Sequence, residues 1–496
     1  MRTFKINKII CLLAISFCSV NAGAQRVITI NDAIKIGQKN SLDAMIARLN
    51  FMSQYWSFRS FKAQLLPSVN LSGDLFEFNR SMVEARNYET GEVSLVKNNT
   101  MSNNMSLSVN QEIVPLGGRV SVESYLYRLD QYSYDKKIYN SQPFRISYTQ
   151  PLRAFNSLRW SQKTEPLKYE KAKRIYLENM EDVTVNAVNL YFSVLSAQSS
   201  YQQSVNTLQD RQQLYKMSEQ RFEIGSITKN DLLQLKLSLL NAEVEKNNME
   251  IELKNQRFRL FSYLRISDYN DIRLIAPDNI PAITVNAEEV VSKALKNSQH
   301  VLSQQLNILD AERNLKEAKA NKGLQMSIHG AVGFSRTTNH FADAYRNLEN
   351  SEIVGLTFSL PIFDWGVSKG RVRMAKSDLE AVRTQMGQAR EKYIEDLQTM
   401  SMKFNMQATQ CNQSRLAQDI AEERYGITKN RFETGSISVT DLNTAQQELE
   451  SARNQYINQL QSFWVNYYTL RRYTLYDWIN HTDLTADYDE LIDGEK

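Results

Sequence analysis

Apolar and polar residues alternate in short runs along both halves of the chain. Alternation with a period of two is the pattern of a β-strand with one apolar and one polar face. Each run is about ten residues long, which is the length of a tilted strand across an outer membrane. Water-soluble β-sandwiches show the same alternation, so this pattern alone leaves both architectures open. The runs are Pro67–Asn79, Met105–Ile113, Val120–Leu129, Phe144–Pro151, Gln325–Phe334 and Val354–Ile362.

Long segments without proline predict unusually long helices. Leu167–Ile224 spans 58 residues, roughly 87 Å, and Val367–Thr434 spans 68 residues, about 100 Å, at about 1.5 Å per residue. Return helices are predicted over Asp231–Arg265 and Asp441–Tyr476. Their apolar stripes are thin and the other faces are polar. This pattern is typical of helices that pack side by side in a wall one helix thick, with water on both faces of the wall. An elongated fibrous rod is the alternative, although it would not need the strands.

A repeated motif lies where each long helix reverses direction. Residues 221–232 and 431–442 share eight of twelve residues at an offset of 210, which predicts two copies of one helix-rich unit. Gly225 and Gly435 suit the left-handed residue that follows a helix C-terminus. Asp231 and Asp441 each come three residues after a Thr or Ser, so a capping box is expected to open each return helix.

The repeat also predicts the domain boundaries. We expect a signal peptide over 1–24, a first repeat over 25–276, a linker over 277–282, a second repeat over 283–480 and a tail over 481–496. The repeats place strands at about 67–151 and 325–362, and hairpin tips near 225–230 and 435–440. The first repeat has 47 more residues than the second between its matched strand positions, which is enough for a second hairpin or very long loops.

Charge and composition narrow the classes of function. The formal net charge is +4 and falls further once a basic signal peptide is removed, which argues against a nucleic acid partner. Cys411 would be the only cysteine of the mature chain, so no internal disulfide is expected. The acidic tail is expected to be solvated and disordered. The four histidines are scattered without metal-ligand spacing, so we expect no enzyme, no metal and no cofactor: His300, His329, His340 and His481.

These motifs resemble the TolC-like outer-membrane efflux protein family. The resemblance rests on the two tips, from Arg221 to Leu232 and from Arg431 to Leu442, and on the strand-to-helix corners at Gln150–Leu152 and Leu360–Gly366. It implies an α+β membrane protein of a Gram-negative outer membrane. Three protomers would close one transmembrane β-barrel in outer-membrane lipid, continued by a long periplasmic α-helical barrel.

The resemblance also implies partners and site residues. The tips would dock a periplasmic adaptor (a membrane fusion protein), which links the homotrimer to an inner-membrane RND or ABC pump for efflux or type I secretion. Asp441 and Asp231 would act at the channel gate, although Thr444 replaces a second acidic residue that the family often has there. The expected docking residues are Phe222, Gly225, Ser226, Ile227, Thr228, Phe432, Gly435, Ser436, Ile437 and Ser438.

Two other functions remain open from the sequence. A periplasmic adaptor also uses a helical hairpin, but adaptors usually carry one hairpin, whereas two tips are present here. A coiled-coil structural protein of the cell envelope would leave the amphipathic strands unexplained.

Overall fold

A computed structural model describes residues 26–86, 89–267, 272–277, 280–434 and 436–493. The predicted signal peptide, Gly435 and part of the predicted linker lie outside these residues. The chain divides into two compact units. The helical unit comprises the described residues within 1–50, 174–298 and 394–496, and the sheet unit comprises those within 51–173 and 299–393.

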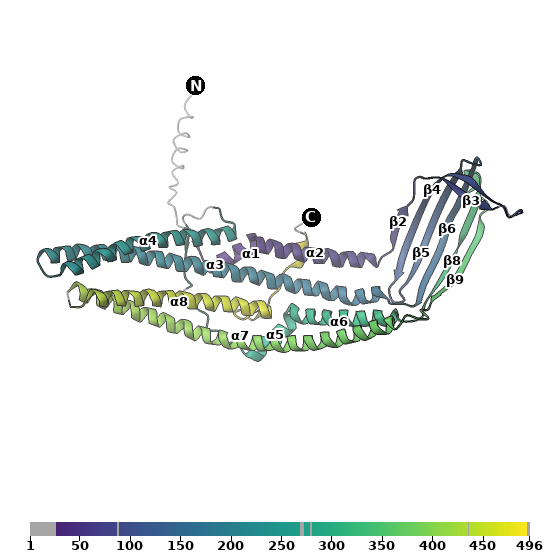
Figure 1. Cartoon of the computed structure of the whole chain (residues 1–496). Coiled ribbons are helices and arrows are strands. Elements are labelled where there is room, and N and C mark those ends of the chain that lie inside the picture. Colours follow the sequence, from purple (N-terminus) through teal and green to yellow (C-terminus); the bar gives the residue numbers. More distant parts are fainter. Residues whose placement is uncertain (1–25, 87–88, 268–271, 278–279, 435, 494–496) are drawn as a thin grey trace, which may run out of the picture. The chain divides into compact units, whose positions relative to one another are not determined.

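Two helical hairpins with matching lengths dominate the chain (Figure 1). Helix α3 (Ser157–Glu223) and helix α7 (Val367–Glu433) have 67 residues each. Their return helices, α4 (Lys229–Leu264) and α8 (Val439–Thr474), have 36 residues each. The shorter helices are α1 (Ile30–Asn40), α2 (Leu42–Gln64), α5 (Ala287–Asn297), α6 (Gln299–Ala320), α9 (Tyr488–Asp493) and the 3-10 turn η1 (Phe341–Asp343).

Helix α3 begins ten residues before the predicted start at Leu167 and runs through Pro166. Proline inside a helix removes one hydrogen bond and crowds the preceding turn, so the prediction treated it as a boundary. The start signal lies earlier, at Asn156, whose side-chain oxygen accepts a hydrogen bond from the backbone N–H of Arg159 at 3.0 Å. This cap satisfies one of the free N–H groups of the first turn.

The sheet unit contains a seven-stranded antiparallel sheet. Its order is β2-β4-β5-β6-β8-β9, and β3 pairs with the same strand β4 as β2 does. The first half of the chain contributes five strands and the second half two, so the additional residues of the first half form paired strands. The strands are β2 (Ser68–Ser72), β3 (Glu77–Arg86), β4 (Val93–Ile113), β5 (Gly118–Gln131), β6 (Lys136–Arg153), β8 (Gln325–Thr338) and β9 (Glu349–Ser359).

Two strand predictions were wrong in detail. The run Pro67–Asn79 is divided between β2 and β3, whose pairings with β4 differ in register by one residue. Between them the chain passes close to β4, where a Cβ on Gly73 would lie 2.4 Å from the carbonyl oxygen of Asn104. Strand β4 begins at Val93, well before the predicted Met105. Its first half is rich in asparagine and shows no alternation, so its pairing with β3 and β5 could not be read from the pattern.

The helical unit has its core where the two hairpins meet short strands. Strand β1 (Arg26–Ile28) pairs in parallel with β7 (Ile272–Leu274). The buried Tyr191 hydroxyl donates to the carbonyl oxygens of Ile28 and Ile275, at 3.0 and 2.7 Å, and so holds this ribbon against α3. The largest fully buried side chains of this unit include Tyr191, Phe192, Phe261, Phe404, Phe463 and Tyr467.

The described part of the tail is ordered, so the prediction of a disordered terminus was wrong. Strand β10 (Tyr476–Asp477) pairs with β11 (Thr482–Asp483), and the Tyr488 ring of α9 meets the Tyr176 ring at 6.4 Å. Aromatic packing gives the tail apolar contacts that its acidic composition does not reveal.

Candidate functional site: hairpin tips and an amphipathic sheet

The first hairpin tip is closed by a Schellman motif. Gly225 has φ +74°, and its N–H donates to the carbonyl oxygen of Phe222 at 2.9 Å. The N–H of Ser226 donates to the carbonyl oxygen of Arg221 at 2.8 Å. This pair of bonds satisfies the free carbonyls at the end of α3 and requires a left-handed residue, which glycine adopts without steric cost. At the second tip the matching bond joins the Ser436 N–H to the Arg431 carbonyl oxygen at 2.9 Å.

Both candidate gate aspartates cap the return helices. The Asp441 carboxylate accepts from the Ser438 hydroxyl at 2.8 Å and from the Ser438 N–H at 3.2 Å. Asp231 accepts from the hydroxyl and the N–H of Thr228, at 2.7 and 3.2 Å. The predicted capping boxes are therefore present at both tips. The Ser438 hydroxyl and N–H lower the pKa of Asp441, so its exposed carboxylate is charged at neutral pH.

The two equivalent phenylalanines of the tips have different environments. Phe432 is 6% exposed and packs with Leu214 of α3 and Leu442 of α8, whereas Phe222 is 39% exposed. Ile437 is partly buried against the same cluster. The sequence repeat predicted the same role for both phenylalanines, but only Phe432 joins the two hairpins. The remaining docking candidates Ser226, Thr228, Ser436 and Ser438 are exposed, and Ile227 is half-buried.

Thr444 adds no charge at the second tip. It is exposed, and its hydroxyl donates to the carbonyl oxygen of Thr440 at 3.0 Å, one turn back along α8. Such a bond occupies the hydroxyl within its own helix.

Polar side chains also connect the two hairpins further along the helices from the tips. Asp210 of α3 accepts hydrogen bonds from the Tyr425 hydroxyl and the Lys429 ammonium group of α7, both at 2.7 Å. Arg211 donates to Gln446 of α8 at 2.7 Å, and burial lowers the pKa of this arginine. Sequence analysis did not identify these residues, because partners more than 200 positions apart leave no local pattern.

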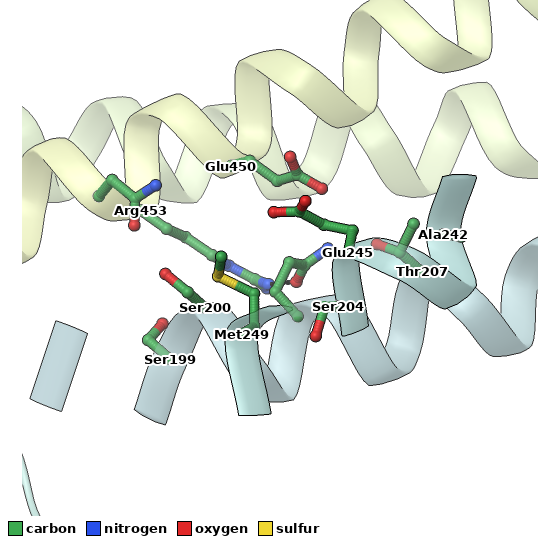
Figure 2. Close-up of a pocket in the computed structure, with 11 residues that line it drawn as sticks. Ser199, Ser200, Ser204, Thr207, Ala242, Glu245, Met249, Glu450 and Arg453 are labelled. Atoms are coloured by element: carbon green, nitrogen blue, oxygen red, sulfur yellow. Dashed lines mark hydrogen bonds between the residues drawn. The ribbon is translucent and has the colours of Figure 1, made fainter. Parts of the chain in front are cut away.

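A pocket of about 180 Å³ lies between α3, α4 and α8. Figure 2 shows Arg453 extending from α8 into it, while Glu245 of α4 and Glu450 of α8 approach each other. Arg453 also donates to Gln203 of α3, and to Glu422 of α7 at 2.8 Å. Small-molecule sites usually occupy about 300–1,000 Å³, so this pocket is a packing gap in the helical wall.

The strand register separates an apolar face of the sheet from a polar one. Cross-strand neighbours on one face are Leu71 with Leu107, Ile146 with Val332, and Ile328 with Leu356. On the other face Asn70 lies opposite Ser108, and Thr149 opposite His329, with 3.0 Å between the Thr149 hydroxyl and His329 Nδ1. The apolar side chains are exposed, with Leu71 at 69% and Leu356 at 58%. A continuous exposed apolar face next to a polar one is typical of a sheet between lipid and water.

Two features relevant to other functions are missing from the described residues. Among them, no group of three or more His, Cys, Asp or Glu side chains could hold a metal ion. Within the same ranges, no helix is long and apolar enough to cross a membrane.

Comparison with known proteins identifies the class of protein. The family model for "Outer membrane efflux protein" matches residues 37–264 and 290–474. The chain therefore belongs to the outer membrane efflux protein family, a family of TolC-like channels. It is an outer-membrane protein with a periplasmic extension.

Individual relatives are distant in sequence. The chain is 23% identical to outer membrane protein TolC of Salmonella enteritidis over 323 residues, covering 63% of this chain and 64% of the relative. It is 24% identical to the Escherichia coli (strain K12) TolC over 310 residues, covering 58% of this chain and 61% of that relative. The matches thus span less than two thirds of either TolC protein.

Solved structures share the fold over a larger part of the chain. The Campylobacter jejuni CmeC outer membrane channel has a TM-score of 0.66 at 15% identity, covering 94% of this chain and 89% of CmeC. The open state of the Neisseria gonorrhoeae MtrE outer membrane channel has a TM-score of 0.58 at 14% identity, covering 90% of this chain and 88% of MtrE.

Proposed function

We propose that three copies of this chain form one export duct. The amphipathic sheets close a single β-barrel in outer-membrane lipid, and the helical hairpins form a periplasmic α-barrel built from two copies of one unit. The observation that carries this proposal is the seven-stranded sheet with an exposed apolar face and open edge strands β2 and β9. An open sheet has unpaired edges that are not tolerated in lipid, so barrel closure with further copies would satisfy them.

The duct would carry solutes passively as the outer-membrane part of a tripartite efflux or type I secretion system. A periplasmic adaptor would bind the tips and connect them to an inner-membrane RND or ABC pump. Family membership favours this function over that of an adaptor or a structural coiled coil.

Gene deletion and reconstitution test this function. We expect deletion to sensitise cells to several toxic compounds or to block export of a secreted product. Purified protein should migrate as a trimer in detergent and conduct ions in planar bilayers. A monomer without conductance, or export that survives deletion, would contradict the proposal.

The glycine of the first tip gives a test of docking. Gly225→Val places a β-branched residue in a left-handed conformation that such residues avoid, so the tip must refold locally. Among the described residues, no heavy atom beyond its chain neighbours lies within 4 Å of its Cβ position, so the defect comes from the backbone alone. We expect trimer yield to persist while export and crosslinking to the adaptor fall. Gly225→Asn is the matched control, because asparagine tolerates this conformation best after glycine.

Asp441 tests whether charge controls the gate. In a threefold assembly Asp441 would form a ring of like charges that attracts cations. We expect Asp441→Ala to reduce cation selectivity in single-channel recordings, with the difference shrinking at high salt because ions screen exposed charges. Ser438→Ala is the control, since it removes the cap but leaves the carboxylate. Equal effects of both substitutions would show that Asp441 acts by capping alone.

A further inference from the structure

Strands β3 and β4 continue past the sheet as a two-stranded ribbon. Pairing between β4 and β5 ends at Thr100, which lies opposite Gln131. Beyond this point, residues 93–99 of β4 pair with residues 80–86 of β3, and these two segments form the ribbon. At about 3.4 Å per residue, the ribbon extends roughly 24 Å past the pairing with β5. It lies at the opposite end of the strands from the ends that connect to α2, α3, α6 and α7. In the proposed duct, this end is the extracellular rim.

The turn after β5 holds the base of the ribbon in place. The Tyr132 N–H donates to the carbonyl oxygen of Asn99 at 2.9 Å, and the Ser133 hydroxyl donates to the carbonyl oxygen of Lys97 at 2.9 Å. The Tyr132 hydroxyl lies 3.6 Å from the sulfur of Met101. These contacts fix the backbone of β4 where it leaves the sheet, so the two faces of the strand keep their directions at the base of the ribbon.

One face of the ribbon continues the apolar face of the sheet. The pairing of β4 with β5 has no bulge, and side chains alternate along a regular strand. Lys97 therefore lies on the same face as Met101 and Leu107. Along this face the apolar side chains of the sheet are followed by cations. The cross-strand pairs here are Phe78 with Met101, Arg80 with Asn99, and Met82 with Lys97.

This face of the ribbon combines positive charge with exposed apolar side chains. It carries three basic residues, Arg80, Arg86 and Lys97, and one carboxylate, Glu84. All four side chains are exposed. The apolar side chains on the same face are each more than half exposed: Met82, Val93 and Leu95.

The cations of the ribbon differ from others near the rim, which already have carboxylate partners. Arg128 of β5 pairs with Asp130 at 2.7 Å, and Arg336 of β8 pairs with Glu349 at 2.8 Å. In the part of the chain that the structure describes, neither Arg80 nor Lys97 forms an ion pair. These two cations are therefore available to an anion from outside the chain.

We propose that this face of the ribbon binds the phosphate groups of anionic glycolipid in the outer leaflet. The proposal rests on the barrel proposed above and adds a lipid site to its rim. Arginine and lysine bind phosphate through charge-assisted hydrogen bonds, and basic residues beside an apolar surface attract anionic headgroups. The acyl chains would contact the apolar face at Phe78 and Met101. Tyr132, which is 52% exposed, suits the boundary between acyl chains and headgroups.

The continuity of the two faces favours lipid over a protein partner. The apolar side chains of the ribbon follow those of the sheet without an intervening polar surface on β3, where Phe78, Arg80 and Met82 succeed one another on the same face. A molecule with apolar chains at the level of Phe78 and negative charge at the level of Arg80 and Lys97 matches this order. A phosphorylated lipid has both parts at that separation.

Binding to lipid A tests the proposal. The full-length protein, purified in detergent and immobilised, would be titrated with phosphorylated lipid A and with lipid A treated with phosphatase. We expect tighter binding of the phosphorylated form, with the difference shrinking at high salt. Each basic residue near an anionic surface contributes roughly a fivefold change in affinity, so Arg80→Gln combined with Lys97→Gln should weaken binding by about 30-fold.

Three matched variants make the result specific. Lys136→Gln removes a cation of the same rim from the polar face, where Lys136 lies opposite Gln131, so the affinity should change less than about twofold. Glu84→Gln removes the carboxylate of the binding face and should tighten binding by about fivefold. Arg80→Lys keeps the charge and should retain most of the affinity.

The failures of the two proposals are distinguishable. A conducting trimer that binds both forms of lipid A equally, or that binds equally with and without Arg80 and Lys97, overturns the phosphate site and leaves the duct standing. An equal loss in Lys136→Gln would show that the overall charge of the rim attracts lipid A, and this result also overturns the site. A wild-type protein that is monomeric and does not conduct would contradict the duct itself.

Discussion

Phe432→Ala should loosen the second hairpin tip, while Phe222→Ala leaves the first tip nearly unchanged. Phe432 is 6% exposed in a cluster with Leu214 and Leu442, so its removal leaves a cavity where α3, α7 and α8 meet. Truncating a buried phenylalanine costs about 3–5 kcal/mol. Phe222 is 39% exposed, and we expect the same truncation there to cost about 1 kcal/mol or less.

Hydrogen exchange at the tips would measure this difference, because local opening exposes backbone amides in proportion to the lost stability. We expect faster exchange over the last turns of α7 and the first turns of α8 in Phe432→Ala. If packing closes the duct, this variant should also show higher resting conductance in planar bilayers. Equal exchange in the two variants would show that Phe432 does not hold the hairpins together.

Arg471→Met should strongly destabilise the helical unit. The Arg471 guanidinium of α8 donates to Glu181 of α3 at 2.9 Å and to Asp477 of β10 at 3.2 Å. The Glu181 and Asp477 side chains are 6% and 11% exposed, so the substitution leaves two buried carboxylates without their cation. Breaking a buried ion pair by removing one partner costs about 3–5 kcal/mol. Urea denaturation followed by circular dichroism would measure the loss.

Arg472→Met is the matched control, one residue further along α8. Arg472 pairs with Asp182 at 3.1 Å, but the two side chains are 36% and 43% exposed. An exposed ion pair contributes about 0–1 kcal/mol, so this variant should stay close to the wild type. A similar loss in both variants would mean that the aliphatic packing of these arginines matters more than the buried charges.

The pH dependence separates charge from packing in Arg471→Met. Burial raises the pKa of Glu181, and Arg471 opposes this shift. Removing the arginine should raise the pKa of Glu181 further, because burial then acts unopposed. A carboxyl group with a raised folded-state pKa favours the fold when protonated, so the deficit should shrink as the pH falls. A deficit that does not depend on pH would point to lost packing.

The sequence by itself determined the elements and their local chemistry. Proline-free length predicted α3 and α7, and the repeated motif predicted the turns, because a left-handed glycine and a Ser/Thr–Asp capping box depend on neighbouring residues only. Alternation predicted the cores of the strands that have one apolar and one polar face, since the period of two follows from strand geometry. Alternation did not reveal the asparagine-rich half of β4, where pairing with β3 overrides local preference. Treating Pro166 as a boundary missed the start of α3, where the Asn156 cap comes earlier in the chain.

Only the tertiary structure decided which of two equivalent residues joins the hairpins. Phe222 and Phe432 occupy the same position of the repeated motif, but burial depends on what lies opposite, and only Phe432 meets α3 and α8. The same reason applies to Asp210 with Tyr425 and to Glu181 with Arg471, whose partners are more than 200 residues away. Local patterns fix the backbone, whereas contacts between distant segments fix which side chains are buried, paired or exposed.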